Sequence, residues 1–298
     1  MPSIGSLTHC GHLNIFGGRD LEQPCVQFPP HLSLQLHFQG AMDVDDAVLA
    51  VKFNPRTDSL DISDSETDNA GLARLAAAVR GSTCLASLNL QRNLLTDLQP
   101  LLAVAHSLPL LASLNVSRNR LPCAALQALP ATCMANLVSL DLCRNAIADK
   151  GAAAAAAFLT ATGASGSLRV LRLRDNRIGH AGAAALAQAL ARPGVLLSEL
   201  DLGANGVGDE GAEAMAFMLT DACALERLWL DMNGVGPVGG LALAAALAAD
   251  SRLAFLSIVD NALGDAGVLA LERAMATNGH LAEVRLRGNG SSLSHTAI

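Results

Sequence analysis

The 298-residue chain repeats one short pattern that joins a strand-like stretch to a helix-like stretch. The copy at residues 168–190, LRVLRLRDNRIGHAGAAALAQAL, begins with the spacing LxxLxL of a short strand that has one apolar side. Asn176 follows, and glycines then open a segment with the helical spacing of Ala and Leu. A single strand and helix of this size cannot bury both apolar faces, whereas stacked copies can. The pattern therefore predicts a solenoid of stacked repeats.

An asparagine recurs at the same position in each copy, so the repeats can be counted from it. The first copy is degenerate and has Ser65 there, and successive positions then lie 28, 26, 26, 31, 29, 28, 28 and 28 residues apart. We expect each amide to turn inward at the strand end, where it can pair with backbone groups that the turn leaves unsatisfied. The array is predicted to hold about nine repeats over residues 57–290. The asparagines are Asn93, Asn119, Asn145, Asn176, Asn205, Asn233, Asn261 and Asn289.

Units of 28 and 29 residues with G-(D/H/P)-x-G before an Ala/Leu helix resemble the ribonuclease-inhibitor type of leucine-rich repeat. The resemblance covers roughly residues 55–290 and is carried best by IGHAGAAALAQAL, VGDEGAEAMAFML, VGPVGGLALAAAL and LGDAGVLALERAM. It implies an α/β leucine-rich repeat solenoid that is curved, with a parallel sheet on the concave face and helices on the convex face. The second and third copies are two residues shorter and hold Pro100, Pro109, Pro122 and Pro130, so short or irregular convex segments are expected there.

The remaining segments flank or interrupt the array. Residues 1–30, punctuated by Gly and Pro, are interpreted as an N-terminal extension, and residues 31–56 as an N-terminal cap that opens with a strand, HLSLQLHF. Residues 160–167, TATGASGS, have the composition of a flexible loop. Residues 291–298 are interpreted as a polar tail, whose last three residues, TAI, resemble a carboxylate-terminal ligand of PDZ domains.

Composition argues against several classes of function. A formal net charge of −7 disfavours nonspecific binding to nucleic acid. No apolar run reaches the roughly 18 residues of a membrane-spanning helix, so no membrane insertion is expected, and residues 1–20 lack the pattern of a secretory signal. The seven cysteines are scattered without a CxxC pair, which favours reduced thiols and a cytoplasmic location.

Catalytic, cofactor-binding and metal-binding patterns are also missing from the sequence. It contains no P-loop, GxSxG or HExxH motif. His9 and His12 flank Cys10 without further ligands at zinc spacing. We therefore predict no catalytic residue, no cofactor and no metal.

Arginine precedes the asparagine in three adjacent repeats, at Arg92, Arg118 and Arg144. Neighbouring strands lie about 5 Å apart, so these side chains are predicted to form a ladder on the concave face. One interpretation is a site for an anion or an acidic partner. The other is three solvated arginines neutralised by Asp141 and nearby groups.

A second group of side chains surrounds the only tryptophan. Trp229 lies between two strand leucines and is therefore expected to point away from the core. Phe255, Met232 and Val259 occupy outward places of the same repeat and the next, and Arg227 lies on the rim. An apolar group with a charged rim resembles an interface hot spot. The alternative is that the curved sheet or a terminal segment covers Trp229.

These features favour a non-enzymatic protein–protein interaction module that binds one or more proteins as part of a multi-protein complex. A scaffold or structural subunit of a larger eukaryotic assembly is expected. Its cytoskeletal or ciliary setting is implied only by the resemblance, because repeats of this type occur in ciliary and other large complexes. The alternative is a GTPase-activating or regulatory protein, since Ran GTPase-activating proteins have the same repeat type, although none of their functional residues can be aligned with this sequence.

Overall fold

The computed structural model describes residues 12–16, 33–37, 44–127, 136–162, 166–219, 223–249 and 252–292. Most of the proposed extension at residues 1–30 lies outside these residues. So do Pro130, the cysteines Cys10, Cys25 and Cys133, and the PDZ-like ending of the chain.

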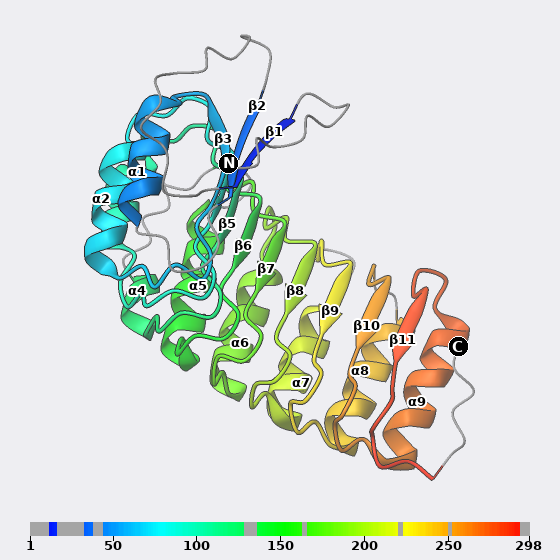
Figure 1. Ribbon diagram of the computed structural model, residues 1–298. Coiled ribbons are helices and arrows are strands. Elements are labelled where there is room, and N and C mark those ends of the chain that lie inside the picture. The colour runs from blue at the N-terminus through cyan, green and yellow to red at the C-terminus, as the bar shows by residue number, and fades with distance from the viewer. Residues whose placement is uncertain are drawn as a thin grey trace.

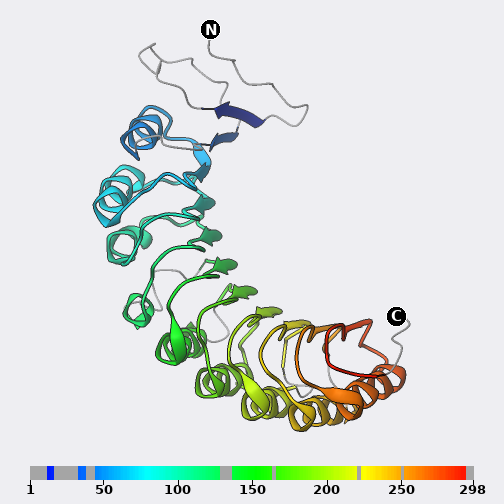
Figure 2. The ribbon, with the colours of Figure 1, turned by 60° about the horizontal axis from the view of Figure 1, so that its bottom comes forward.

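Within the described residues, one parallel sheet runs through the molecule, with eleven strands in chain order. Register joins equivalent leucines, so that Leu228 lies between Leu200 and Leu256 and all three are fully buried. The strands line the inner side of an arc and the helices its outer side (Figures 1 and 2). The strands are β1 His12–Phe16, β2 Ser33–His37, β3 Thr57–Asp61, β4 Ser87–Asn89, β5 Ser113–Asn115, β6 Ser139–Asp141, β7 Val170–Arg172, β8 Glu199–Asp201, β9 Arg227–Trp229, β10 Phe255–Ser257 and β11 Glu283–Arg285. The expected curved solenoid with a concave parallel sheet is confirmed.

The outer helices differ in length as the prolines predicted. The two shortest, α3 and α4, have seven and five residues. Pro100 is the second residue of α3, and Pro122 directly precedes α4. By contrast α5 continues to Thr162, so the expected loop over 160–167 begins later than predicted. The helices are α1 Val44–Phe53, α2 Asn69–Val79, α3 Gln99–Ala105, α4 Cys123–Gln127, α5 Ala148–Thr162, α6 His180–Leu190, α7 Gly208–Met218, α8 Pro237–Ala249 and α9 Gly264–Thr277.

The N-terminal end of the sheet extends beyond the repeats. Strand β2 lies within the proposed cap, and β1, inside the proposed extension, pairs with it in parallel. The cap also contains α1, which the alternating pattern of the sequence did not predict. Buried Val44, Ala47 and Val51 pack this helix against α2, so it covers the first repeat.

Each asparagine links its own repeat to the preceding one. The Nδ2 group of Asn176 donates to the carbonyl oxygens of Leu173 in its own repeat, at 3.0 Å, and of Leu142 in the preceding repeat, at 2.9 Å. Its Oδ1 accepts from the backbone N–H of Ile147, also in the preceding repeat, at 3.4 Å. The Nδ2 donation to the preceding repeat recurs in all eight asparagines. The predicted role of the amides is confirmed, and it extends across the repeat boundary.

Paired glycines let neighbouring helices approach closely. Oδ1 of Asp209, at the start of α7, accepts from the backbone N–H groups of Gly236 at 2.7 Å and Gly239 at 2.9 Å, at the start of α8. A Cβ atom added at Gly239 would lie 2.8 Å from that oxygen and 2.8 Å from Cβ of Ala212. Any side chain at the second glycine of the G-x-x-G motif would therefore clash with the aspartate that caps this helix from the preceding repeat. Asp149 caps α6 in the same way.

The residue before each asparagine, or before Ser65 in the first repeat, has a left-handed backbone in all nine repeats. Its φ lies between 52° and 76°. This conformation costs an L-residue other than glycine about 1–2 kcal/mol, yet only the last repeat has glycine there. The positions are Asp64, Arg92, Arg118, Arg144, Asp175, Ala204, Met232, Asp260 and Gly288.

Ala204→Gly is expected to raise the free energy of unfolding by about 0.5–1 kcal/mol. Glycine removes the left-handed strain, and its greater freedom in the unfolded chain offsets part of the gain. Urea denaturation measures the difference. The matched control is Ala184→Gly within α6, which should lower the free energy by about 1 kcal/mol. Destabilisation by both substitutions would contradict the strain at Ala204.

Candidate functional site

The side chains between the strand leucines change character along the concave face. On β3 to β6 they are serine, asparagine or aspartate, and from β7 onward most of them are larger, charged or aromatic. The first group is Ser59, Asp61, Ser87, Asn89, Ser113, Asn115, Ser139 and Asp141. The second group comprises Val170, Arg172, Glu199, Asp201, Arg227, Trp229, Phe255, Ser257, Glu283 and Arg285.

Two aromatic rings meet across β9 and β10. The ring centroids of Trp229 and Phe255 lie 5.0 Å apart at an interplanar angle of 46°. The guanidinium carbon of Arg227 lies 5.3 Å from the Trp229 centroid and 5.2 Å from the Phe255 centroid, and that of Arg285 lies 5.0 Å from Phe255. Guanidinium groups at such distances are attracted to the negative face of an aromatic ring. We call these four residues the aromatic patch.

The two rings differ in how far they are exposed to solvent. Phe255 faces the concave side as expected, but only 6% of it is exposed, because Trp229 and two guanidinium groups cover it. Trp229 is half-buried. The expectation that Phe255 itself offers an apolar contact is therefore wrong, and the accessible part of the patch is Trp229 with the arginines above Phe255.

Ion pairs flank the aromatic patch. Nε of Arg285 lies 2.6 Å from Glu283, and Nη2 of Arg172 lies 3.8 Å from Glu199. Arg227 has no carboxylate partner among the residues that the structure describes. These side chains are partly exposed to solvent, so their ion pairs contribute little to stability.

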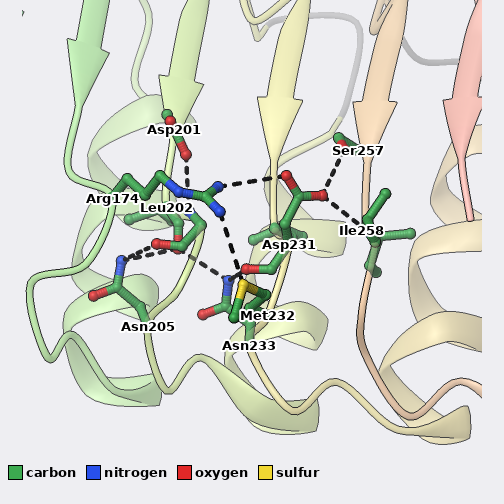
Figure 3. Close-up of polar contacts among 12 residues, drawn as sticks. Arg174, Asp201, Leu202, Asn205, Asp231, Met232, Asn233, Ser257 and Ile258 are labelled. Atoms are coloured by element: carbon green, nitrogen blue, oxygen red, sulfur yellow. Dashed lines mark hydrogen bonds and ion pairs between the residues drawn. The ribbon is translucent and has the colours of Figure 1, made fainter. Parts of the chain in front are cut away.

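A polar network beside the patch ties β7, β9 and β10 together (Figure 3). Asp231 accepts from the Ser257 hydroxyl at 2.5 Å and from the Val259 backbone N–H at 2.9 Å. The same carboxylate lies 3.5 Å from a guanidinium nitrogen of Arg174 and is only 15% exposed. Met232, which follows Asp231, is 52% exposed. The network therefore holds the neighbourhood of Trp229 in one arrangement and leaves Met232 at the surface.

Two titratable groups in this region are perturbed by burial. Burial raises the pKa of Asp201, against the opposing effects of the Gly203 N–H and Arg174. Burial, followed by the nearby Asp141 carboxylate, raises the pKa of the Cys143 thiol well above its ordinary value. Cys143 is therefore protonated at neutral pH and is a poor nucleophile.

The three arginines before the asparagines lie at the turn that follows each strand. Arg92 lies 3.5 Å from Asp64, and Arg144 lies 3.7 Å from Asp175. Of the groups expected to neutralise them, neighbouring aspartates pair with two of the arginines, whereas Asp141 accepts from the backbone N–H of Cys143 and forms no ion pair with them among the described residues. Together these arginines border a depression of about 450 Å³. It is lined by Asp64, Arg92, Asn93, Leu94, Arg118, Asn119, Arg120 and Arg144.

Several surface features lay beyond the sequence reasoning. Arg120 joins the depression from the place after the asparagine, and a sequence comparison of that place between repeats could have found it. On the convex side Phe217 is 84% exposed, next to α8, which contains no polar side chain. The described residues contain no cluster of three or more metal-binding side chains, and none of their helices is both long and apolar enough to cross a membrane.

Comparisons with known proteins agree with this architecture. Residues 133–154, 165–187 and 196–216 match the family model described as Leucine Rich repeat. Among solved structures, an internalin (inlF) of Listeria monocytogenes aligns with a TM-score of 0.52 and 16% identity, over 89% of this chain and 68% of that one. Internalin C2 (inlC2) of the same organism aligns with a TM-score of 0.46 and 22% identity, over 74% and 76%. A comparison with curated protein sequences gave no match.

At these identities the likeness concerns the fold alone, and the match is to leucine-rich repeats in general. The chain folds as an α/β leucine-rich repeat solenoid.

Proposed function

We propose that the solenoid is a protein-binding scaffold whose partner is held by the aromatic patch on the concave face. The observation that carries the proposal is the half-buried Trp229, whose ring packs at a tilt against Phe255 and is bordered by the guanidinium group of Arg227. Tryptophan and arginine are the side chains most enriched where interface residues dominate binding energy.

The residues around the aromatic patch already restrain its side chains, so a partner can bind with little loss of side-chain entropy. The ring of Trp229 is restrained by Phe255 beneath it, and the strands below are cross-linked by Asp231 through Ser257 and Arg174. A surface already fixed in its bound geometry loses little side-chain entropy when a partner docks. The flanking Arg172 and Glu199 carry opposite charges. We therefore infer a partner segment with an apolar anchor and charged flanks.

Finer aspects belong to the same proposal. Membership in a multi-protein complex suits a long rigid face, and spacings of 28 and 29 residues with long outer helices α5 to α9 support repeats of the ribonuclease-inhibitor type. The eukaryotic assembly with its cytoskeletal or ciliary setting, the cytoplasmic location and the absence of nucleic acid stay predictions. So does the alternative of a GTPase-activating protein.

Trp229→Ala is expected to reduce partner capture at least about tenfold, because truncating an interface hot spot costs about 2 kcal/mol or more. The tagged protein is captured from its native cells with its stoichiometric partners, and the amounts recovered by wild type and variant are compared. Phe217→Ala is the matched control, since it removes an 84% exposed aromatic ring from the convex side. Undiminished capture by Trp229→Ala, with both variants folded, would reject the patch.

A further inference from the structure

The arginines at successive turns are held in line by the backbone. The N–H of Arg92 donates to the carbonyl of Ser117 at 3.0 Å, and the N–H of Arg118 donates to the carbonyl of Cys143 at 2.7 Å. Each acceptor directly precedes the next arginine, so Arg92, Arg118 and Arg144 are one strand apart, at about 4.8 Å. With Arg120 these residues form what we call the arginine edge.

Charge along the arginine edge is uneven. The outer two arginines are paired, Arg92 with Asp64 and Arg144 with Asp175. Arg118 and Arg120, between them, are exposed and have no carboxylate partner within the described part of the chain. In a protein with a net charge of −7, unpaired positive charge is therefore concentrated at the centre of the edge. An aspartate borders the edge on each side.

Folding stability does not explain these arginines. All three ladder positions are left-handed, with φ of 55° or 56°, where glycine carries no strain and occurs at Gly288 in the last repeat. Three like charges in neighbouring strands repel one another, so a bound anion would reduce the repulsion between these arginines.

We propose that the arginine edge binds a short acidic segment of a partner protein. The three arginines span about 10 Å, the length of about three extended residues, so that carboxylates at alternate positions of such a segment, which share one face, can meet the guanidinium groups. Guanidinium groups bind carboxylates through two parallel hydrogen bonds. The half-exposed Leu94, 38% accessible, lines the same depression and provides contact for an apolar side chain of the segment.

The flanking aspartates restrict the length of the ligand. A long acidic tract or a nucleic-acid strand would place negative charge against Asp64 and Asp175, whereas two to four carboxylates fit between them. The site lies on β4 to β6, whereas the aromatic patch is built mainly on β9 and β10, so the proposal does not rest on the function assigned to Trp229.

The test measures binding of two fluorescent peptides by anisotropy. One has four consecutive glutamates between Gly-Ser ends, and the other has four glutamines. We expect wild type to bind the glutamate peptide at least about tenfold more tightly, with affinity falling as salt is raised toward about 0.15 M. Arg118→Glu should weaken this binding at least about tenfold, because it reverses the central charge.

Two control variants distinguish binding at the arginine edge from an effect of overall charge and from binding at the aromatic patch. Arg273→Glu makes the same charge change on the convex helix α9 and should leave the affinity within about twofold, as should Trp229→Ala. Equal binding of both peptides, or equal loss in Arg118→Glu and Arg273→Glu, would overturn the proposal. Tighter, Arg118-dependent binding of a single-stranded oligonucleotide of matched charge would overturn it in favour of nucleic acid.

Discussion

Asn176→Ala is expected to lower the free energy of unfolding by about 3 kcal/mol. The side chain is fully buried and bridges two repeats, so its loss removes its hydrogen bonds to the carbonyl oxygens of Leu142 and Leu173, each of which keeps an amide donor from another asparagine. It also leaves the buried backbone N–H of Ile147 without its acceptor, the Asn176 Oδ1. Each buried polar group left unsatisfied costs about 1–3 kcal/mol. Urea denaturation of the full chain, followed by circular dichroism, measures the loss.

Two comparisons make that result specific to the amide bridge. Asn176→Asp keeps the size but replaces the donor with an acceptor that faces two carbonyl oxygens, so it should destabilise at least as much as alanine. Gln188→Ala removes an exposed amide from α6 and should change the free energy by less than about 0.5 kcal/mol. Similar effects of Asn176→Ala and Gln188→Ala would contradict the bridging role.

Leu228→Ala is expected to lower the free energy of unfolding by about 2–5 kcal/mol, as other core truncations of leucine do. Leu228 is fully buried between the equivalent leucines of the neighbouring strands, Leu200 and Leu256. Rigid neighbours on both sides limit how far the cavity can collapse, so the loss should fall in the upper part of this range. The measurement is again the urea transition of the full chain.

The control for this leucine lies on the opposite face of the solenoid. Leu241, on α8, is 47% exposed, so Leu241→Ala removes the same atoms without opening a cavity. We expect a change below about 1 kcal/mol. A loss as large as that of Leu228→Ala would show that the convex side is part of a core that the described residues do not account for.

The sequence was sufficient to predict the structural features that recur in every repeat. The LxxLxL spacing and the recurring asparagine depend on residues within one unit, and stacking identical units fixes the parallel sheet, its concave position and the burial of the leucines. The positions of Pro100 and Pro122 likewise predicted the short outer helices α3 and α4, because proline ends or restricts a helix locally.

Features that arise between repeats were beyond prediction. Phe255 is covered by Arg227 and Arg285, each 28–30 residues away in sequence, so its burial depends on contacts that no single unit reveals. The left-handed residue before each asparagine was hidden because its identity varies from Arg118 to Met232. The cap that Asp209 supplies to the next helix also crosses a repeat boundary.

The most direct test of the aromatic patch uses its own fluorescence. Trp229 is the only tryptophan and the chain has no tyrosine, so tryptophan emission reports on this site alone. Quenching by acrylamide is measured for the free protein and for the complex with its purified partner, provided that the partner or fragment lacks tryptophan. We predict a severalfold smaller quenching constant in the complex. An unchanged constant in a complex shown to be saturated by size-exclusion chromatography would place the partner elsewhere and contradict the account.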